Sequence, residues 1–247
     1  MSGILIVAEH TRGVLADISL ELIGAALAVK DKLGGPLRVL VSGEGANAFI
    51  PALDRPGVDE ILVAESGNPH FDAALAEEAT VRAALASEPA LILIGHSASG
   101  GSFASAVAVR LGSGFAADVF GLEVTPSGLQ ATRSTHGGKV NVELDFPGKA
   151  MVALTIRGST FKAPEGVGTA TVTPFAVPLD GLKGRCRHQG YEEAPSSDVD
   201  IGKAEFILSI GRGIQDEKNV PRFAALAEKL GATLGCSRPV ADSGWLP

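Results

Sequence analysis

The sequence predicts an α/β protein with a mostly parallel sheet flanked by helices, followed by an incomplete second α/β domain. Three observations predict it. Short, continuous apolar runs alternate with longer helical patterns up to Gly112. A polar, proline- and serine-containing stretch follows much later, and after it comes one further strand-turn-helix-strand pattern. With 247 residues, 45% of them hydrophobic, the chain can bury a substantial core.

The first half of the chain alternates between strand and helix patterns. Residues 3–8 (GILIVA) are continuously apolar, as expected for a strand that is buried on both faces. Beyond Asp17, apolar residues recur at helical spacing through Leu33, and Gly34-Gly35-Pro36 ends the pattern. The same reasoning predicts strands at 37–42, 60–64 and 90–95, and helices at 46–53, 71–86 and 102–111. This alternation favours a Rossmann-like or adenine-nucleotide-hydrolase-like sheet.

The pattern of predicted elements changes near Val119. Short β-like runs punctuated by Gly and Pro replace the alternation with helices. These runs either extend the first sheet or form an antiparallel layer of their own. They lie at residues 121–124, 129–134, 139–146, 151–156 and 170–174.

A polar segment separates the two predicted domains. It contains the stretch EEAPSSDVD, which is typical of a linker. We therefore expect a first domain over 1–185, a linker over 186–203 and the start of a second domain over 204–247. A unit of ~40 residues with two strands cannot bury both of its faces by itself. It must either pack on the first domain or be completed by further chain.

Charge and hydropathy exclude several classes of protein. The net charge is −7 and basic residues form no runs, which argues against nucleic-acid binding. No apolar segment reaches the ~18–20 residues that span a bilayer, so membrane insertion is not expected. The N-terminus lacks the features of a secretory signal, and the expected location is the cytoplasm, or the mitochondrial matrix in a eukaryote. Cys186 and Cys236 are expected to be reduced thiols.

Two loops of the second domain carry the strongest functional signal. Gly211-Arg212-Gly213 follows an apolar strand at 206–210, and Ser237-Arg238 follows a second strand at about 232–234. Loops at the carboxyl ends of parallel strands are where open α/β sheets bind ligands. An arginine beside small residues suits a pyrophosphate or an electron-rich ring. Each loop taken alone could equally be a surface turn with a solvated arginine.

The two motifs together resemble the alpha subunit of electron-transfer flavoproteins. The resemblance rests on GRG followed by a helix and then GxSRPVxDxGW, in this order and spacing. It extends more loosely over ILIVAEH, RLGSGFAADVFGLE and ALTIRGSTFKAPE. Later FAD-contacting loops of that family have no counterpart in this sequence. On this resemblance the chain is expected to be a truncated or proteolysed alpha subunit, or a short variant that does not hold FAD alone.

The resemblance implies a cofactor, site residues and partners. FAD is the cofactor, with Gly211, Arg212 and Gly213 near its phosphates or the flavin. Ser237 is implied to hydrogen-bond FAD, and Arg238 to place its guanidinium against the isoalloxazine ring, where a fixed positive charge raises the flavin potential. The implied function is electron carriage without substrate conversion, in a heterodimer with a beta subunit. Electrons would pass from acyl-CoA or other flavin dehydrogenases to a quinone oxidoreductase or another acceptor.

A second reading is a nucleotide-binding module without redox chemistry. The stretch from Gly95 to Ser102 follows a buried strand and opens a helix, so Ser97–Ser102 could bind an anion. A hydrolase is disfavoured because Ser99 stands where a GxSxG elbow needs glycine. The five histidines show no metal-ligand spacing, and a metal site is not expected.

Overall fold

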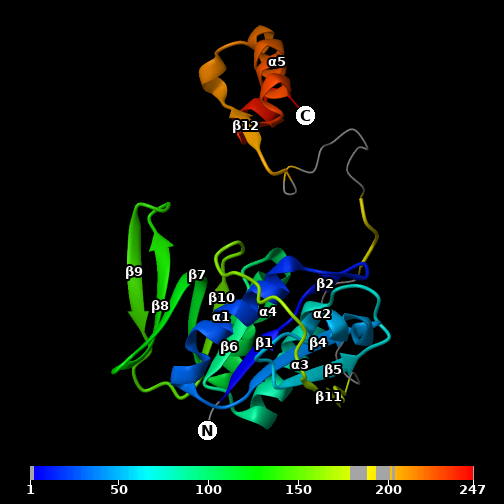
Figure 1. The fold of residues 1–247 in the computed structure, drawn as a ribbon, viewed down its shortest axis with the longest axis vertical. Helices are drawn as coiled ribbons and strands as arrows, with labels where there is room; N and C mark the ends of the chain where they lie inside the picture. Colours follow the sequence, from blue (N-terminus) through cyan, green and yellow to red (C-terminus); the bar gives the residue numbers. More distant parts are fainter. Residues whose placement is uncertain (1–2, 179–187, 193–200, 202–203, 247) are drawn as a thin grey trace. The chain divides into compact units, whose positions relative to one another are not determined.

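The computed structural model describes residues 3–178, 188–192, 201 and 204–246 (Figure 1). The chain divides into two compact units, Met1–His188 and Gln189–Pro247, and each is described here by itself. The predicted linker, 186–203, lies mostly outside the described residues, so the proposed boundaries at 185 and 204 stay predictions. Within the described ranges, no helix combines the length and the apolar character that a bilayer span needs.

The first unit is built on one sheet, and the prediction of a mostly parallel α/β fold is confirmed. Its strands are β1 (Ile4–Val7), β4 (Leu37–Gly43), β5 (Glu60–Glu65), β6 (Leu91–Gly95), β7 (Gly114–Thr125), β8 (Gly128–Thr135), β9 (Val140–Asp145), β10 (Val152–Ile156) and β11 (Thr171–Pro174). They follow one another in the order β11-β5-β4-β1-β6-β10-β7-β8-β9, and only the pairs β7–β8 and β8–β9 are antiparallel. A short antiparallel ribbon, β2 (His10–Thr11) with β3 (Val14–Leu15), follows β1.

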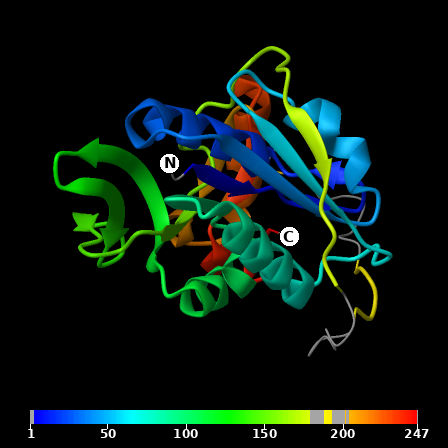
Figure 2. The same cartoon turned by 90° about the horizontal axis from the view of Figure 1, so that it is seen from below.

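The β-rich middle of the sequence extends this sheet and forms no separate layer. β7 pairs in parallel with β10 and antiparallel with β8. The strands β7, β8 and β9 therefore continue the sheet at one end, and β11 forms the edge at the other end (Figure 2). The strand predicted from Gly121 begins seven residues earlier, at Gly114. Its first half reads GFAADVF, where small residues break the alternation of apolar and polar side chains that marks a strand in sequence.

Helices cover both faces of the sheet. They are α1 (Asp17–Leu33), α2 (Ile50–Leu53) with the preceding 3₁₀ turn η1 (Ala46–Phe49), α3 (Ala73–Ser87) and α4 (Ala98–Leu111). Ile4 packs in one buried cluster with Leu22 of α1, whereas its neighbour Leu5 packs in a second cluster with Phe103 of α4. Successive residues of β1 therefore enter opposite cores, which explains why this strand reads as continuously apolar.

The helix N-termini correct two details of the sequence prediction. Helix α4 begins at Ala98 and not at 102, because the Ser97 hydroxyl accepts a hydrogen bond of 2.9 Å from the Gly100 amide and caps the helix. Two glycines in its first turn, which have low helix propensity, concealed this start. In α1, Asp17 is the first helical residue and the cap is Ala16, with no side-chain capping bond.

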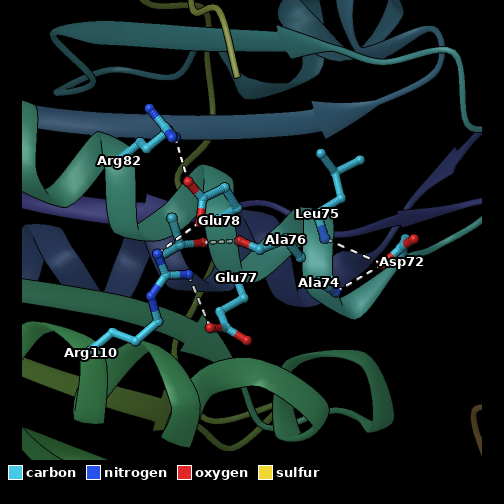
Figure 3. Close-up of polar contacts among 9 residues, drawn as sticks. Asp72, Ala74, Leu75, Ala76, Glu77, Glu78, Arg82 and Arg110 are labelled. Carbon is cyan, nitrogen blue, oxygen red and sulfur yellow. Dashed lines mark hydrogen bonds and ion pairs between the residues drawn. The ribbon is translucent and has the colours of Figure 1, made fainter. Parts of the chain in front are cut away.

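An ion-pair network joins α3 to α4 (Figure 3). Arg110 on α4 donates to Glu77 at 3.1 Å and to Glu78 at 2.8 Å, and Arg82 also donates to Glu78, at 2.5 Å. The Glu78 side chain is only 12% exposed. The guanidinium of Arg110 lowers the pKa of Glu78 below its ordinary value, chiefly through its hydrogen bond. The network thus fixes the contact between two helices that share one face of the sheet.

The second unit is the β-α-β unit that the sequence predicted. Strands β12 (Ile207–Ile210) and β13 (Thr233–Cys236) pair in parallel, and helix α5 (Val220–Leu230) lies between them in the chain. Gly231, with φ of 64°, ends α5 in the left-handed conformation that glycine adopts readily. Short turns complete the unit: η3 (Arg212–Ile214), η4 (Glu217–Asn219) and α6 (Arg238–Ala241).

Candidate functional site

The five predicted site residues lie in two loops that leave the same end of the β12–β13 pair. The last residues of the two strands, Ile210 and Cys236, are register partners. The Ser237 amide donates a hydrogen bond of 2.9 Å to the Ile210 carbonyl, so the pairing continues into the loops. A Cβ atom built on Gly211 would lie 3.6 Å from the Ser237 hydroxyl oxygen. The parallel register therefore places the two loops side by side.

The first loop presents an open backbone and an exposed cation. Gly211 is extended, with φ of −123° and ψ of 179°, and the chain then turns through η3. A Cβ atom built on Gly213 would meet no atom within 4 Å, so space is open on that side. The Arg212 side chain is exposed and makes no hydrogen bond or ion pair with the described residues. This loop can approach an anionic ligand closely and offers it a guanidinium.

The second loop leaves a hydroxyl available. Ser237 stands at the start of α6, but its side chain makes no capping bond. Its backbone carbonyl instead accepts the Val240 amide at 2.8 Å. Pro239 lies in the first turn of α6, where its fixed φ favours the helical start. Because Ser237 is exposed and its hydroxyl caps no amide, that oxygen can donate to or accept from a ligand.

Arg238 has a weak partner that the sequence analysis did not foresee. Its Nε lies 3.5 Å from Asp242 Oδ2, one helical turn onward, and the two side chains are 91% and 65% exposed. Exposed pairs of this kind contribute little free energy, so the guanidinium can turn to a ligand at small cost. The i, i+4 spacing within the SRPVxD motif was the available signal for this pair.

The chemistry of the two loops fits FAD. Two exposed guanidinium groups match the oxygens of a pyrophosphate and the face of a conjugated ring. The open side of Gly213 permits close approach, and the Ser237 hydroxyl supplies a neutral hydrogen bond. Among the residues that the structure describes, no group of histidine, cysteine, aspartate and glutamate side chains is arranged to hold a metal ion.

The alternative anion site at Ser97–Ser102 contains a carboxyl group of the protein itself. Ser97 Oγ donates a hydrogen bond of 2.6 Å to Glu9 Oε2, and the other oxygen, Oε1, is buried without a hydrogen-bond partner among the described atoms. Burial raises the pKa of Glu9. The cavity that Glu9 lines has a volume of about 40 Å³, which is far below the few hundred Å³ of a ligand pocket. The Glu9 side chain of the protein itself therefore occupies the space at this end of α4, and the loop does not support a nucleotide site.

Comparison with known proteins agrees with the geometry of both units. Residues 4–180 match the family model described as "Electron transfer flavoprotein domain", and residues 200–247 match "Electron transfer flavoprotein FAD-binding domain". The chain is 45% identical over 248 residues to the "Electron transfer flavoprotein subunit alpha" of Methylophilus methylotrophus, covering 100% of this chain and 77% of that protein. It is 32% identical over 254 residues to the protein of the same name from Mycobacterium leprae (100% and 76% covered).

A more distant relative carries a different name. The chain is 28% identical over 250 residues to "Lactate dehydrogenase (NAD(+),ferredoxin) subunit LctC" of Acetobacterium woodii, covering 98% of this chain and 59% of that protein. The matches to both domain models and the identity along the whole chain lead to one assignment. The chain belongs to the electron transfer flavoprotein alpha-subunit family.

Proposed function

We propose that this chain carries electrons as the alpha subunit of an electron transfer flavoprotein and contributes the Gly211–Gly213 and Ser237–Arg238 loops to the FAD site. The observation that carries the proposal is the side-by-side placement of these loops at the carboxyl ends of β12 and β13. They lie within the residues that match the FAD-binding domain. FAD, when bound, supplies the one-electron chemistry, and the protein converts no substrate of its own.

Each residue has a distinct role in this proposal. The backbone of Gly211 and Gly213 allows the phosphates to approach, and Arg212 supplies a positive charge to them. The Ser237 hydroxyl hydrogen-bonds the cofactor. Arg238 lays its guanidinium against the isoalloxazine ring, where its charge favours the reduced form and raises the potential.

The proposed partners follow from the same assignment. The chain forms a heterodimer with a beta subunit in the cytoplasm. It receives electrons from acyl-CoA or other flavin dehydrogenases and delivers them to a quinone oxidoreductase or another acceptor. The net charge of −7 is compatible with docking to partners through defined charged contacts.

The test is flavin binding by the chain together with its beta subunit. The two chains are coexpressed and purified, FAD is titrated into the complex, and visible absorption and flavin fluorescence are recorded. Saturable binding that is weakened at least tenfold by Arg212→Ala, and unchanged by Arg222→Ala on the exposed surface of α5, supports the proposal. A complex that binds no FAD at micromolar concentrations, or a chain that binds AMP or ATP instead, would contradict it.

A further inference from the structure

The loop after β12 contains one residue in a strained conformation. Gln215 has a φ of 71° and a ψ of −37°, a region that residues other than glycine rarely adopt. The Asp216 amide donates a hydrogen bond of 3.0 Å to the Ile214 carbonyl, two positions earlier. This bond closes a turn around Gln215 that is close to the classic γ-turn, which is rare and strained. Such a conformation persists only where neighbouring contacts stabilise it.

The side chain of Asn219 supplies such a contact. Its Nδ2 atom donates a hydrogen bond of 2.8 Å to the Ile214 carbonyl, five positions earlier in the chain. The same carbonyl oxygen accepts the Asp216 amide, so it has two donors. The bond from Asn219 joins the start of α5 to the middle of the loop. It therefore holds the turn from the helix that follows.

Asn219 stands at a position where its side chain would ordinarily make a different bond. It is the N-cap residue of α5, and an asparagine there usually accepts a hydrogen bond from the amide of the second or third helical residue. In this protein it makes no such bond. Pro221 occupies the second helical position and has no amide to donate. The side chain bonds the loop instead of capping the helix.

The bonds within the loop also determine which backbone groups it offers to a ligand. The Ile214 amide donates to the Gly211 carbonyl at 3.1 Å, and the Gln215 amide donates to the Arg212 carbonyl at 2.9 Å. Together with the Ile214 carbonyl, three carbonyl oxygens of the loop are thus occupied by donors from the same segment. Unoccupied carbonyl oxygens would repel the phosphates of a cofactor. The turn around Gln215 therefore keeps the loop in a conformation that favours an anion.

From these contacts we propose that Asn219 is a positioning residue of the FAD site, which fixes the strained turn at Gln215 and so places the Arg212 guanidinium for the phosphates. Asn219 acts through the loop and touches no reacting atom. The inference rests on the proposed function, because it takes the Gly211–Gly213 loop as part of the FAD site. The bond from Asn219 is exposed to solvent, and exposed side chains contribute little to stability. Its loss should therefore affect FAD affinity more than the melting temperature.

The test is titration of FAD into the heterodimer with the beta subunit, followed by flavin fluorescence. Asn219→Ala should weaken FAD binding about five- to tenfold, because one hydrogen bond and the turn that depends on it are lost. Ser243→Ala is the matched control, since it removes another exposed 2.8 Å hydrogen bond to a backbone carbonyl of the same unit, that of Pro239. The control should change the affinity by less than about twofold, and both variants should melt at similar temperatures.

Two double variants separate positioning from a general structural effect. In a chain that already carries Arg212→Ala, Asn219→Ala should weaken FAD binding by less than about twofold, because the guanidinium that it places is absent. Adding Gln215→Gly to Asn219→Ala should restore most of the lost affinity. Glycine adopts a positive φ at no steric cost, so the turn then forms without the supporting bond.

The outcomes distinguish this inference from the proposed function. Equal affinities of Asn219→Ala and Ser243→Ala, or an equal loss from Asn219→Ala with and without Arg212, would overturn the positioning role alone. A failure of Gln215→Gly to restore binding, or a melting temperature several degrees lower for Asn219→Ala than for Ser243→Ala, would do the same. A wild-type heterodimer that binds no FAD would overturn the proposed function, and this inference with it.

Discussion

Arg157 and Arg238 illustrate how a neighbouring carboxylate determines what a guanidinium can do. Arg157 holds Asp118 through two bonds of 2.7–2.8 Å, so its orientation is fixed. Arg238 lies 3.5 Å from Asp242 with both side chains exposed, so its orientation is easily changed. The first arrangement suits a rigid surface, and the second suits a residue that must turn towards a ligand.

Replacing Arg238 tests its proposed charge effect on the flavin. Arg238→Ala should lower the first one-electron potential of the bound flavin by about 60 mV or more, the equivalent of a tenfold change in a one-electron equilibrium. Spectroelectrochemical titration of the FAD-loaded heterodimer measures it. Arg222→Ala, on α5 of the same unit, should shift the potential by only a few millivolts, and an equal shift in both variants would rule out a local effect.

Glu9 allows a prediction about pH. Burial raises its pKa in the folded state above the ordinary value of 4.5, so the native protein binds the proton more tightly than the unfolded chain does. The stability from this group is present below pH 4.5 and is lost as the pH rises through the folded-state pKa. Glu9→Gln should remove this loss of stability at higher pH, while its amide oxygen still accepts a hydrogen bond from the Ser97 hydroxyl. Its melting temperature, relative to wild type, should therefore rise as the pH increases from 4.5 to 7.

The sequence indicated which residues are charged and which make the backbone flexible, but not which side chains lie together in the fold. The motif placed Gly211, Ser237 and Arg238 in loops, and the structure brings these loops together because their strands pair in parallel. Nothing in the sequence relates Arg157 to Asp118 or Glu9 to Ser97, which are 88 positions apart in the latter case. Such pairs arise only from the strand order, which short-range patterns do not encode.

At the scale of single elements, α4 depends on one close approach. A Cβ atom built on Gly100 would lie 2.1 Å from the Gly95 carbonyl oxygen, whereas one built on the adjacent Gly101 would meet nothing within 4 Å. Gly100→Ala should therefore destabilise the protein by several kcal/mol. Gly101→Ala should stabilise it by about 0.5–1 kcal/mol, since alanine is the better helix former. Urea unfolding of both variants measures these changes in the free energy of unfolding. Equal changes in the two variants would show that a backbone shift relieves the contact between residue 100 and the Gly95 carbonyl.

The contact between α3 and α4 should depend on pH. The hydrogen bond from Arg110 lowers the pKa of Glu78 below 4.5, so the stability it gives is present above pH 4.5 and is lost as the pH falls through the folded-state value. Arg110→Ala should reduce the free energy of unfolding at pH 7 by about 1–2 kcal/mol, and acid unfolding should begin at a higher pH. Arg82→Ala, which breaks only a pair within α3, should cost about 0.3–0.5 kcal/mol.

Hydrophobic periodicity predicted the strands and helices of the first half well, because each is long or continuously apolar. It failed where small residues dominate, at the start of α4 and in the first half of β7. There the conformation depends on a cap or on neighbouring strands. The short ribbon of β2 and β3 escaped prediction because each of its strands has only two residues, too few to show a periodicity.

For the whole molecule, the division into two domains is a prediction that expression can test. Both buried clusters consist of residues within the first unit, so residues 1–185 should fold alone and unfold cooperatively near the transition temperature of the whole chain. Residues 204–247 alone should lack a cooperative transition, because two strands and a helix bury too little apolar surface. A fragment 1–185 that stays unfolded would show that the second unit is required for the first.

The ends of the nine-stranded sheet also limit how the chain can self-associate. In β11, the amides of Thr171 and of the following Phe175 point to β5, so the outward positions are Val172 and Pro174, and proline has no amide to donate. This edge is a poor template for another strand. β9, at the other end, alternates Asn141, Glu143 and Asp145 with apolar residues and keeps its full set of amides. Edge-to-edge association through this nine-stranded sheet should therefore stop at pairs joined through β9, since a fibre needs two receptive edges.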